Sequence, residues 1–194
     1  MAGIQVVKAT QDDIERCAAA LLLAFSNDPF VRWMFPEPES YLTCFGAMLR
    51  LFAGTAIESG SAYVAEDSRA AAIWLPPGAQ TDRGAIDALM QAGIAAERKQ
   101  EVFGMLSLMG GSHPDQDHYY LQLLGADPAC QGMGYGTALL ERSLLAVDEA
   151  HLPAFLVSSN ARNQPLYERF DFRVTQAIQS GSSPSVWPML REAR

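Results

Sequence analysis

A glycine-rich turn between a strand and a helix constrains the fold of this chain more than any other feature. Residues 118–126 form a continuous apolar run typical of a buried strand, and Asp127-Pro128 ends it. The apolar spacing of residues 137–150 predicts a helix. The turn that joins the two is Gln131-Gly132-Met133-Gly134-Tyr135-Gly136. Because glycine allows positive φ and the first turn of a helix has free amides, this arrangement predicts a phosphate site.

Two common phosphate-binding patterns do not match the turn. A P-loop requires a lysine in G-x-x-x-x-G-K-[ST], and this segment has none. The dinucleotide pattern G-x-G-x-x-G fails because Thr137 stands at the last glycine position, and the turn lies late in the chain. The pattern that fits is Q-x-x-G-x-G, from Gln131 to Gly136.

The other elements predict one α/β domain over residues 1–194. We expect helices from the N-cap Thr10 to Phe25 and over 40–58, 82–108 and 137–150, with a short helix within 160–170. We expect Asp28-Pro29 to break the helical pattern. The expected strands are 4–8, 61–66, 70–75, 118–126, 154–158, 172–178 and 186–190. This order predicts a mixed sheet with helices on both faces.

Composition limits the partners and the compartment. The net charge is −8, with only two lysines, which argues against a nucleic-acid partner. The longest apolar stretch, Cys17 to Phe25, is too short to span a bilayer, and the N-terminus lacks the features of a signal peptide. Three scattered cysteines without a C-x-x-C pair disfavour disulfides and zinc. We therefore expect a cytoplasmic protein with no membrane partner.

A second motif follows the glycine-rich turn at a characteristic separation. The segment 160–172 matches N-x-x-[AN]-x-x-x-Y-x-x-x-G-F, with Asn160 and Tyr167 in register and Asp171 in place of the glycine. Together with Q-x-x-G-x-G, this segment resembles the GNAT superfamily of N-acetyltransferases. The segments 74–78, 118–121 and 187–189 are similar to the branch that contains puromycin N-acetyltransferase. That branch often has a glutamate where this chain has Val157-Ser158.

The resemblance implies a binding site for acetyl-CoA. It places the pantetheine arm beside the central strand and the pyrophosphate on the turn, and it assigns the Ala126 amide to the developing oxyanion. Asn160 would bond the arm of the coenzyme, and it could also cap a helix. The implied cofactor-binding residues are Leu124, Gly125, Ala126, Gln131, Gly132, Met133, Gly134, Tyr135, Gly136, Thr137, Asn160 and Asn163.

Tyr167 is the expected general acid. A phenol, with an unperturbed pKa of about 10, can give a proton to a departing thiolate, whose pKa is about 8.5. Periodicity alone would make Tyr167 a core aromatic on an amphipathic helix. Its spacing from Asn160 favours catalysis.

The general base and the acceptor pocket have weaker signals. His118 titrates in the right range for a base, although a histidine bonded to a backbone carbonyl would look the same. His113 and His151 have no ligand spacing with it, so no metal is expected. Asp28, Trp33 and Trp74 are the acceptor-binding residues that the family's architecture implies. Core packing of both tryptophans and a helix-ending turn at Asp28 are the alternatives.

The sequence therefore predicts direct acetyl transfer from acetyl-CoA to a primary amine of a small molecule. Another acyl-CoA donor and a protein amine as acceptor stay open. A CoA-binding regulatory module without turnover stays open as well, and the presence of Tyr167 speaks against it. The strand at 187–189 could pair across a homodimer or close the sheet of a monomer.

Overall fold

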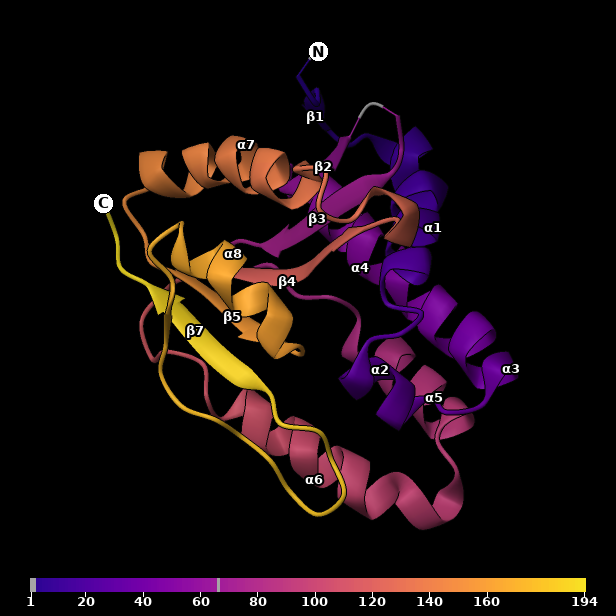
Figure 1. Ribbon diagram of the computed structural model, residues 1–194. Helices are drawn as coiled ribbons and strands as arrows, with labels where there is room; N and C mark the ends of the chain where they lie inside the picture. The colour runs from indigo at the N-terminus through magenta and orange to yellow at the C-terminus, as the bar shows by residue number, and fades with distance from the viewer. Residues whose placement is uncertain (1–2, 66) are drawn as a thin grey trace.

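The computed structural model describes residues 3–65 and 67–194, which form one α/β fold around a seven-stranded mixed sheet (Figure 1). The strand order is β1-β2-β3-β4-β5-β7-β6. The strands are β1 Val6–Lys8, β2 Ala62–Ala65, β3 Ala70–Leu75, β4 Tyr119–Ala126, β5 Ala154–Ser158, β6 Arg173–Val174 and β7 Trp187–Arg191. The α-helices are α1 Ile14–Ala24, α2 Pro29–Met34, α3 Pro38–Ser40, α4 Gly46–Glu58, α5 Arg83–Gly93, α6 Lys99–Gly110, α7 Tyr135–Glu149 and α8 Gln164–Glu168.

Alternation along the inner strands creates two cores. Side chains of successive strand residues point to opposite faces, so Ala62 and Val64 pack towards α1 and α4, whereas Tyr63 and Ala65 pack towards α7. On the next strand Ile73 faces the first core. Helices α7 and α8 therefore cover one face of the sheet, and α1 and α4 cover the other (Figure 1).

The centre of the sheet opens at one end. Strands β4 and β5 are parallel, but their pairing covers only Tyr119 to Leu121 of β4. The rest of β4 continues to pair with β3 on its other edge. Beyond Leu121 the β5-side edge of β4 is therefore free, and an open edge of backbone groups is available to a ligand.

A β-bulge lies where this opening starts. Ile73 of β3 faces Leu123, and Trp74 faces Leu121, so Gln122 is the extra residue on β4. Bulges re-aim a side chain and increase local twist, and they are frequent beside functional sites. The Gln122 side chain is therefore displaced from the regular alternation of β4.

Several expected elements differ in their boundaries. Asp28-Pro29 starts a helix rather than ending one, because the Asp28 carboxylate accepts from the amides of Phe30 and Val31 and proline is compatible with the first helical position. The helix expected over 82–108 is two helices, α5 and α6, separated at Ile94 and Ala95. The strand expected over 172–178 is reduced to β6 and an isolated bridge from Ile178 to Val186. Glu66, expected to end a strand, lies outside the described residues.

Among the described residues, one helical stretch, Pro38–Glu58, has the length and apolar composition to cross a membrane. Within this fold it is a core helix. A π-helical turn, Tyr41–Phe45, leads into α4, which packs along α1 and against β3. Leu49, Ala53 and Ala56 are fully buried there.

The last strand closes the sheet of the monomer. β7 pairs antiparallel with β5 on one edge and with β6 on the other. Of the two arrangements left open for residues 187–189, the structure has the intramolecular one, so both edges of this strand are already used within the chain.

Candidate active site

The glycine-rich turn has the geometry of an anion site. Gly132 and Gly134 have φ values of +77° and +95°, a region that residues with a side chain rarely adopt. The Ala138 amide makes the first bond of α7, to the Gly134 carbonyl. The three amides between them have no intrahelical acceptor, and the helix dipole adds positive charge there. A Cβ on Gly132 would meet nothing within 4 Å, so the turn is open to a ligand.

The turn is fixed from behind by side chains. The Tyr135 hydroxyl donates to Asp67 in the β2–β3 turn, and Arg69 donates to Cys130 Sγ at 3.1 Å. Tyr135 is 9% exposed. Its side chain is therefore structural, and only its backbone amide is free for a phosphate.

The open edge of β4 presents two amides beside this turn. The Asp127 amide donates to the carbonyl of Arg69, the residue just before β3, at 2.7 Å. Because alternate residues of an antiparallel strand bond to the same side, the amides of Leu124 and Ala126 point away from β3. A Cβ on Gly125 would lie 2.6 Å from the Ala24 Cβ, so glycine is needed for α1 to pack here. The opening is thus held in place by α1.

Tyr167 lies on α8 with its ring edge-on to Phe172 and is 7% exposed. It lines the same cavity as Leu124 and Ser159. Burial, and then the negative charge of Asp28, raise the pKa of Tyr167 above its ordinary value. The phenol consequently keeps its proton at neutral pH and is available as a proton donor.

Asp28 is a positioning residue in this arrangement. Its Oδ1 accepts from the amides of Phe30 and Val31, both at 3.0 Å, and its Oδ2 accepts from Ser159 Oγ at 2.6 Å. Burial raises the pKa of Asp28, and these hydrogen bonds act against that rise. The carboxylate therefore ties the start of α2 to the loop after β5.

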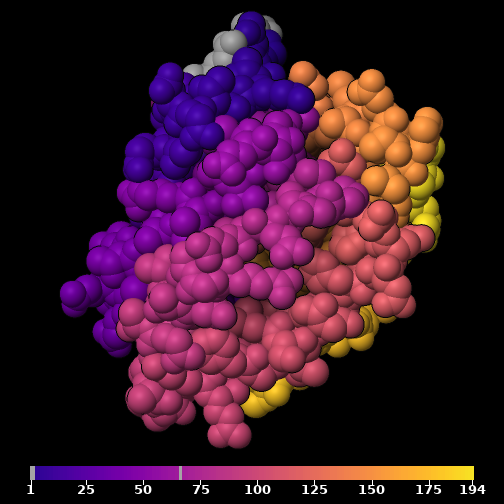
Figure 2. All heavy atoms as spheres, turned by 180° about the vertical axis from the view of Figure 1, so that it is seen from behind, coloured from indigo at the N-terminus to yellow at the C-terminus, as the bar shows by residue number. Residues whose placement is uncertain are grey.

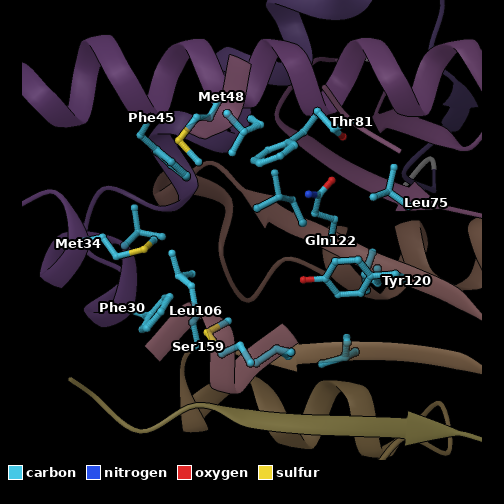
Figure 3. Close-up of a pocket in the computed structure, with 18 of the residues that line it drawn as sticks. Phe30, Met34, Phe45, Met48, Leu75, Thr81, Leu106, Tyr120, Gln122 and Ser159 are labelled. Atoms are coloured by element: carbon cyan, nitrogen blue, oxygen red, sulfur yellow. The ribbon is translucent and has the colours of Figure 1, made fainter. Parts of the chain in front are cut away.

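A cavity of about 770 Å³ extends from Tyr167 along β4 to α5 and α6. Its labelled side chains come from α2, the π-helical turn, α4, α6, the ends of β3 and β4 and the loops after β3 and β5, and they converge on one space (Figure 3). From behind, the surface is hollowed between the magenta segment that follows β3 and the pink segment around α6 (Figure 2). A small acceptor could reach the open β4 edge through such a cavity.

Comparison with known proteins decides the family. Residues 51–172 match the model of the Acetyltransferase (GNAT) family. This chain belongs to the GNAT family. An uncharacterized N-acetyltransferase of Schizosaccharomyces pombe is 26% identical over 180 residues, which cover 86% of this chain and 73% of that protein.

Solved structures agree with this GNAT fold. The structure of histone acetyltransferase HPA2 and related acetyltransferase from Corynebacterium glutamicum is 25% identical, with a TM-score of 0.71, covering 100% of this chain and 98% of that one. The polyamine N-acetyltransferase of Drosophila melanogaster is 16% identical, with a TM-score of 0.68, covering 98% and 100%. The second likeness supports the fold alone.

The structure corrects the assignment of His118 as a base in this GNAT domain. His118 lies at the paired end of β4, and its Nε2 is 3.1 Å from His113 Nδ1 while its Nδ1 bonds to the Gln116 carbonyl at 2.8 Å. It does not line the cavity described above. A histidine bonded to backbone, the alternative reading, is what the structure contains.

The histidine pair predicts a pH dependence of stability. Burial, and then the charge of His118, lower the pKa of His113 to about 4. His113 takes up a proton near pH 6.5 in the unfolded chain but not in the folded one. The free energy of unfolding is therefore highest above that pH and falls as the pH drops from about 6.5 towards 4. Because His113 is partly exposed, we expect this free energy to fall by about 1–2 kcal/mol. Urea unfolding of wild type and His113→Phe at several pH values measures this loss. The free energy of unfolding should change less with pH in the variant than in wild type.

The exposed His151 supplies the control for this measurement. His151→Asn should keep the slope of wild type, since His151 lies at a surface position with φ of +51°, which asparagine tolerates. An equal slope in His113→Phe and wild type would contradict the assignment.

Neither tryptophan lines the cavity. Trp74 is 1% exposed and packs in the core beneath α7, on the opposite face from α4. Trp33 stacks on Phe30, lies under Arg98 and donates from Nε1 to Ser182 Oγ at 3.1 Å. The structure therefore corrects the assignment of both as acceptor-binding residues and favours the packing alternative.

The remaining expected residues surround the turn and the loop after β5. Asn160 caps the short helix Ala161–Asn163 by accepting from the Arg162 amide at 3.1 Å, and Asn163 is exposed on the cavity wall. Gln131 and Met133 are exposed on the turn. Asp171 has φ of +66°, as expected for a residue in a glycine position. Among residues 3–65 and 67–194, no group of three or more His, Cys, Asp or Glu is placed to hold a metal.

Sequence reasoning missed three residues beside the site. Arg169 donates to Thr137 Oγ1 at 3.1 Å, which brings a cation next to the glycine-rich turn. Gln122 and Thr81 line the cavity. Arg169 stands two residues after Tyr167, at a position that the motif leaves open, and no sequence pattern marks the other two.

Proposed function

We propose that this chain transfers the acetyl group of acetyl-CoA directly to a primary amine of a small molecule. The observation that carries the proposal is that one end of the sheet combines three parts. These are the glycine turn at the start of α7, the free amides of β4 and the buried, protonated Tyr167. Each part answers one need of the reaction: phosphate binding, charge stabilisation and protonation of the thiolate.

Acetyl-CoA fits the residues present and would supply the thioester. Positive φ at Gly132 and Gly134 and the free amides of α7 suit its pyrophosphate, and Arg169 adds a cation there. The amides of Leu124 and Ala126 suit its amide-bearing arm, and the Ala126 amide is assigned to the negative charge that develops on the thioester oxygen.

The chemistry left to side chains is proton transfer. As the amine nitrogen bonds to the acetyl carbon, the carbon–sulfur bond breaks, and the Tyr167 hydroxyl gives its proton to the sulfur. The phenolate regains a proton from the amine through solvent. We assign no side chain as general base, because His118 lies outside the cavity and the oxygens of Asp28 are bonded.

The family match supports an amine as the acceptor. The fly protein named above, whose likeness to this chain shows the fold alone, is a polyamine N-acetyltransferase that forms N-acetylagmatine. The similarities at 74–78, 118–121 and 187–189 are the basis for placing the chain in the branch of puromycin N-acetyltransferase. Cys17, Cys44 and Cys130 are free thiols, in keeping with the reducing cytoplasm proposed as its location.

The test is a titration of the purified protein with acetyl-CoA, followed by release of free thiol in the presence of primary amines. We expect micromolar binding and amine-dependent thiol release. Parallel reactions with propionyl-CoA and succinyl-CoA test whether another acyl-CoA is the donor. A parallel reaction with a lysine peptide tests whether a protein amine is the acceptor. Binding without thiol release for any amine would favour a regulatory module, and no binding by folded protein would refute the proposal.

A further inference from the structure

The acceptor side of the cavity is apolar and aromatic. Side chains from α2, the π-helical turn, α4 and α6 form most of its wall (Figure 3). They are Phe30, Met34, Phe45, Met48, Phe103 and Leu106. An apolar wall contributes binding free energy in proportion to the apolar surface it removes from water, at about 25 cal/mol per Å². Such a cavity favours a ligand with a bulky apolar body.

The same cavity offers little to a ligand with several charges. Among its described lining residues, the ones with full charges are Arg83 and Asp87, both on α5 and both exposed. The nearby carboxylate of Asp28 already accepts three hydrogen bonds. A second ammonium group deep in the cavity would be desolvated without an opposite charge, which is costly.

Two polar atoms of the wall are buried and lack partners within the described structure. They are Oε1 of Gln122 and Oγ1 of Thr81. The bulge inserts Gln122 into β4 at the cavity, and the labelled hydroxyl of Tyr120 also points into the open space (Figure 3). A buried polar atom left without a hydrogen bond costs about 1–3 kcal/mol, so a ligand group that bonds to it is favoured.

We infer that the acceptor is a primary amine with a single positive charge and a bulky, mainly apolar body, and that one polar group on this body bonds to Gln122 and Thr81. The inference rests on the proposed function for the role of the amine. It goes further in that it names the class of acceptor and two residues that determine specificity.

Three probe amines separate the possibilities. 2-Phenylethylamine has an apolar ring, tyramine adds one hydroxyl to that ring, and spermidine is a flexible polycation. Binding of each to the complex with CoA is measured by calorimetry, and acetylation is measured by thiol release. We expect tyramine to bind about tenfold more tightly than 2-phenylethylamine, and spermidine to bind at least about 100-fold more weakly than tyramine.

Variants test the two residues directly. Gln122→Leu and Thr81→Val should each bring the tyramine to 2-phenylethylamine ratio close to one. Because each removes an unpartnered buried polar atom, the melting temperature should be unchanged or higher, whereas loss of a structural hydrogen bond would lower it. Gln91→Leu makes the same exchange at an exposed position of α5 that does not line the cavity, and it should keep the wild-type ratio.

The binding and transfer measurements separate this inference from the proposed function. The expected order of binding without thiol release would support the acceptor class and refute transfer. Tighter binding of spermidine than tyramine would overturn the acceptor class even with rapid turnover. A ratio unchanged in both cavity variants, or no binding of any probe, would also overturn it.

Discussion

Replacing Gly134 with glutamate is expected to weaken acetyl-CoA binding by at least about 100-fold. The φ of +95° at this position costs about 1–2 kcal/mol for a residue with a side chain. The new carboxylate would also repel phosphate and reduce the positive potential at the start of α7. Since 1.4 kcal/mol corresponds to a factor of about ten, the two effects together give the expected loss. Isothermal titration of wild type and variant measures it.

Two further variants separate the causes. Gly134→Ala introduces the strain without the charge, so an intermediate loss of about tenfold is expected. Gly104→Glu adds the same charge on α6, where a Cβ would meet nothing within 4 Å, and should bind like wild type. Equal affinity of Gly134→Glu and wild type for acetyl-CoA would show that the coenzyme does not bind at this turn.

Replacing Tyr167 with phenylalanine should lower kcat by about 10²–10⁴-fold, the usual contribution of a positioned acid. The affinity for acetyl-CoA should stay within about twofold, because the ring and its packing on Phe172 are retained. Since the pKa of Tyr167 is raised above its ordinary value of about 10, its deprotonation should cause no fall in kcat below pH 10. Steady-state kinetics from pH 6 to 10, with titration of the coenzyme, measure both quantities.

Tyr63 provides the matched control. It is 1% exposed, lies in the core beneath α7, and its hydroxyl has no partner in the described structure. Tyr63→Phe should therefore keep the wild-type kcat. An unchanged kcat in Tyr167→Phe would exclude this hydroxyl as the acid, and an equal loss in both variants would point to general destabilisation.

Local patterns were sufficient to predict the parts of the site that depend on neighbouring residues. Three glycines were expected to shape the turn. Gly132 and Gly134 have positive φ, which only glycine adopts freely, whereas Gly136 lies in the first turn of α7 and does not. Asp171 stands at the glycine position of the second motif, and its φ of +66° is one that glycine adopts freely. The mixed sheet followed from the order of the apolar segments, and it is confirmed.

Local patterns were insufficient where a residue's role depends on distant parts of the chain. His118 and Tyr167 both looked able to transfer protons, but His118 lies just before the end of β4 that pairs with β5, whereas Tyr167 lines the cavity. The bulge that exposes Gln122 depends on the register with β3, which no pattern within β4 contains. Trp74, expected at the acceptor site with core packing as the alternative, lies in the core beneath α7 and does not line the cavity.

The glycine-rich turn, the Tyr167 motif and the family were predictable from the sequence, since each is encoded over a dozen or so adjacent residues. The cavity, its apolar wall and its two unpartnered polar atoms could be found only in the folded chain. This is because the wall is assembled largely from helices between residues 29 and 110 and from a strand after them. Their relative placement is set by packing across the sheet and not by local spacing.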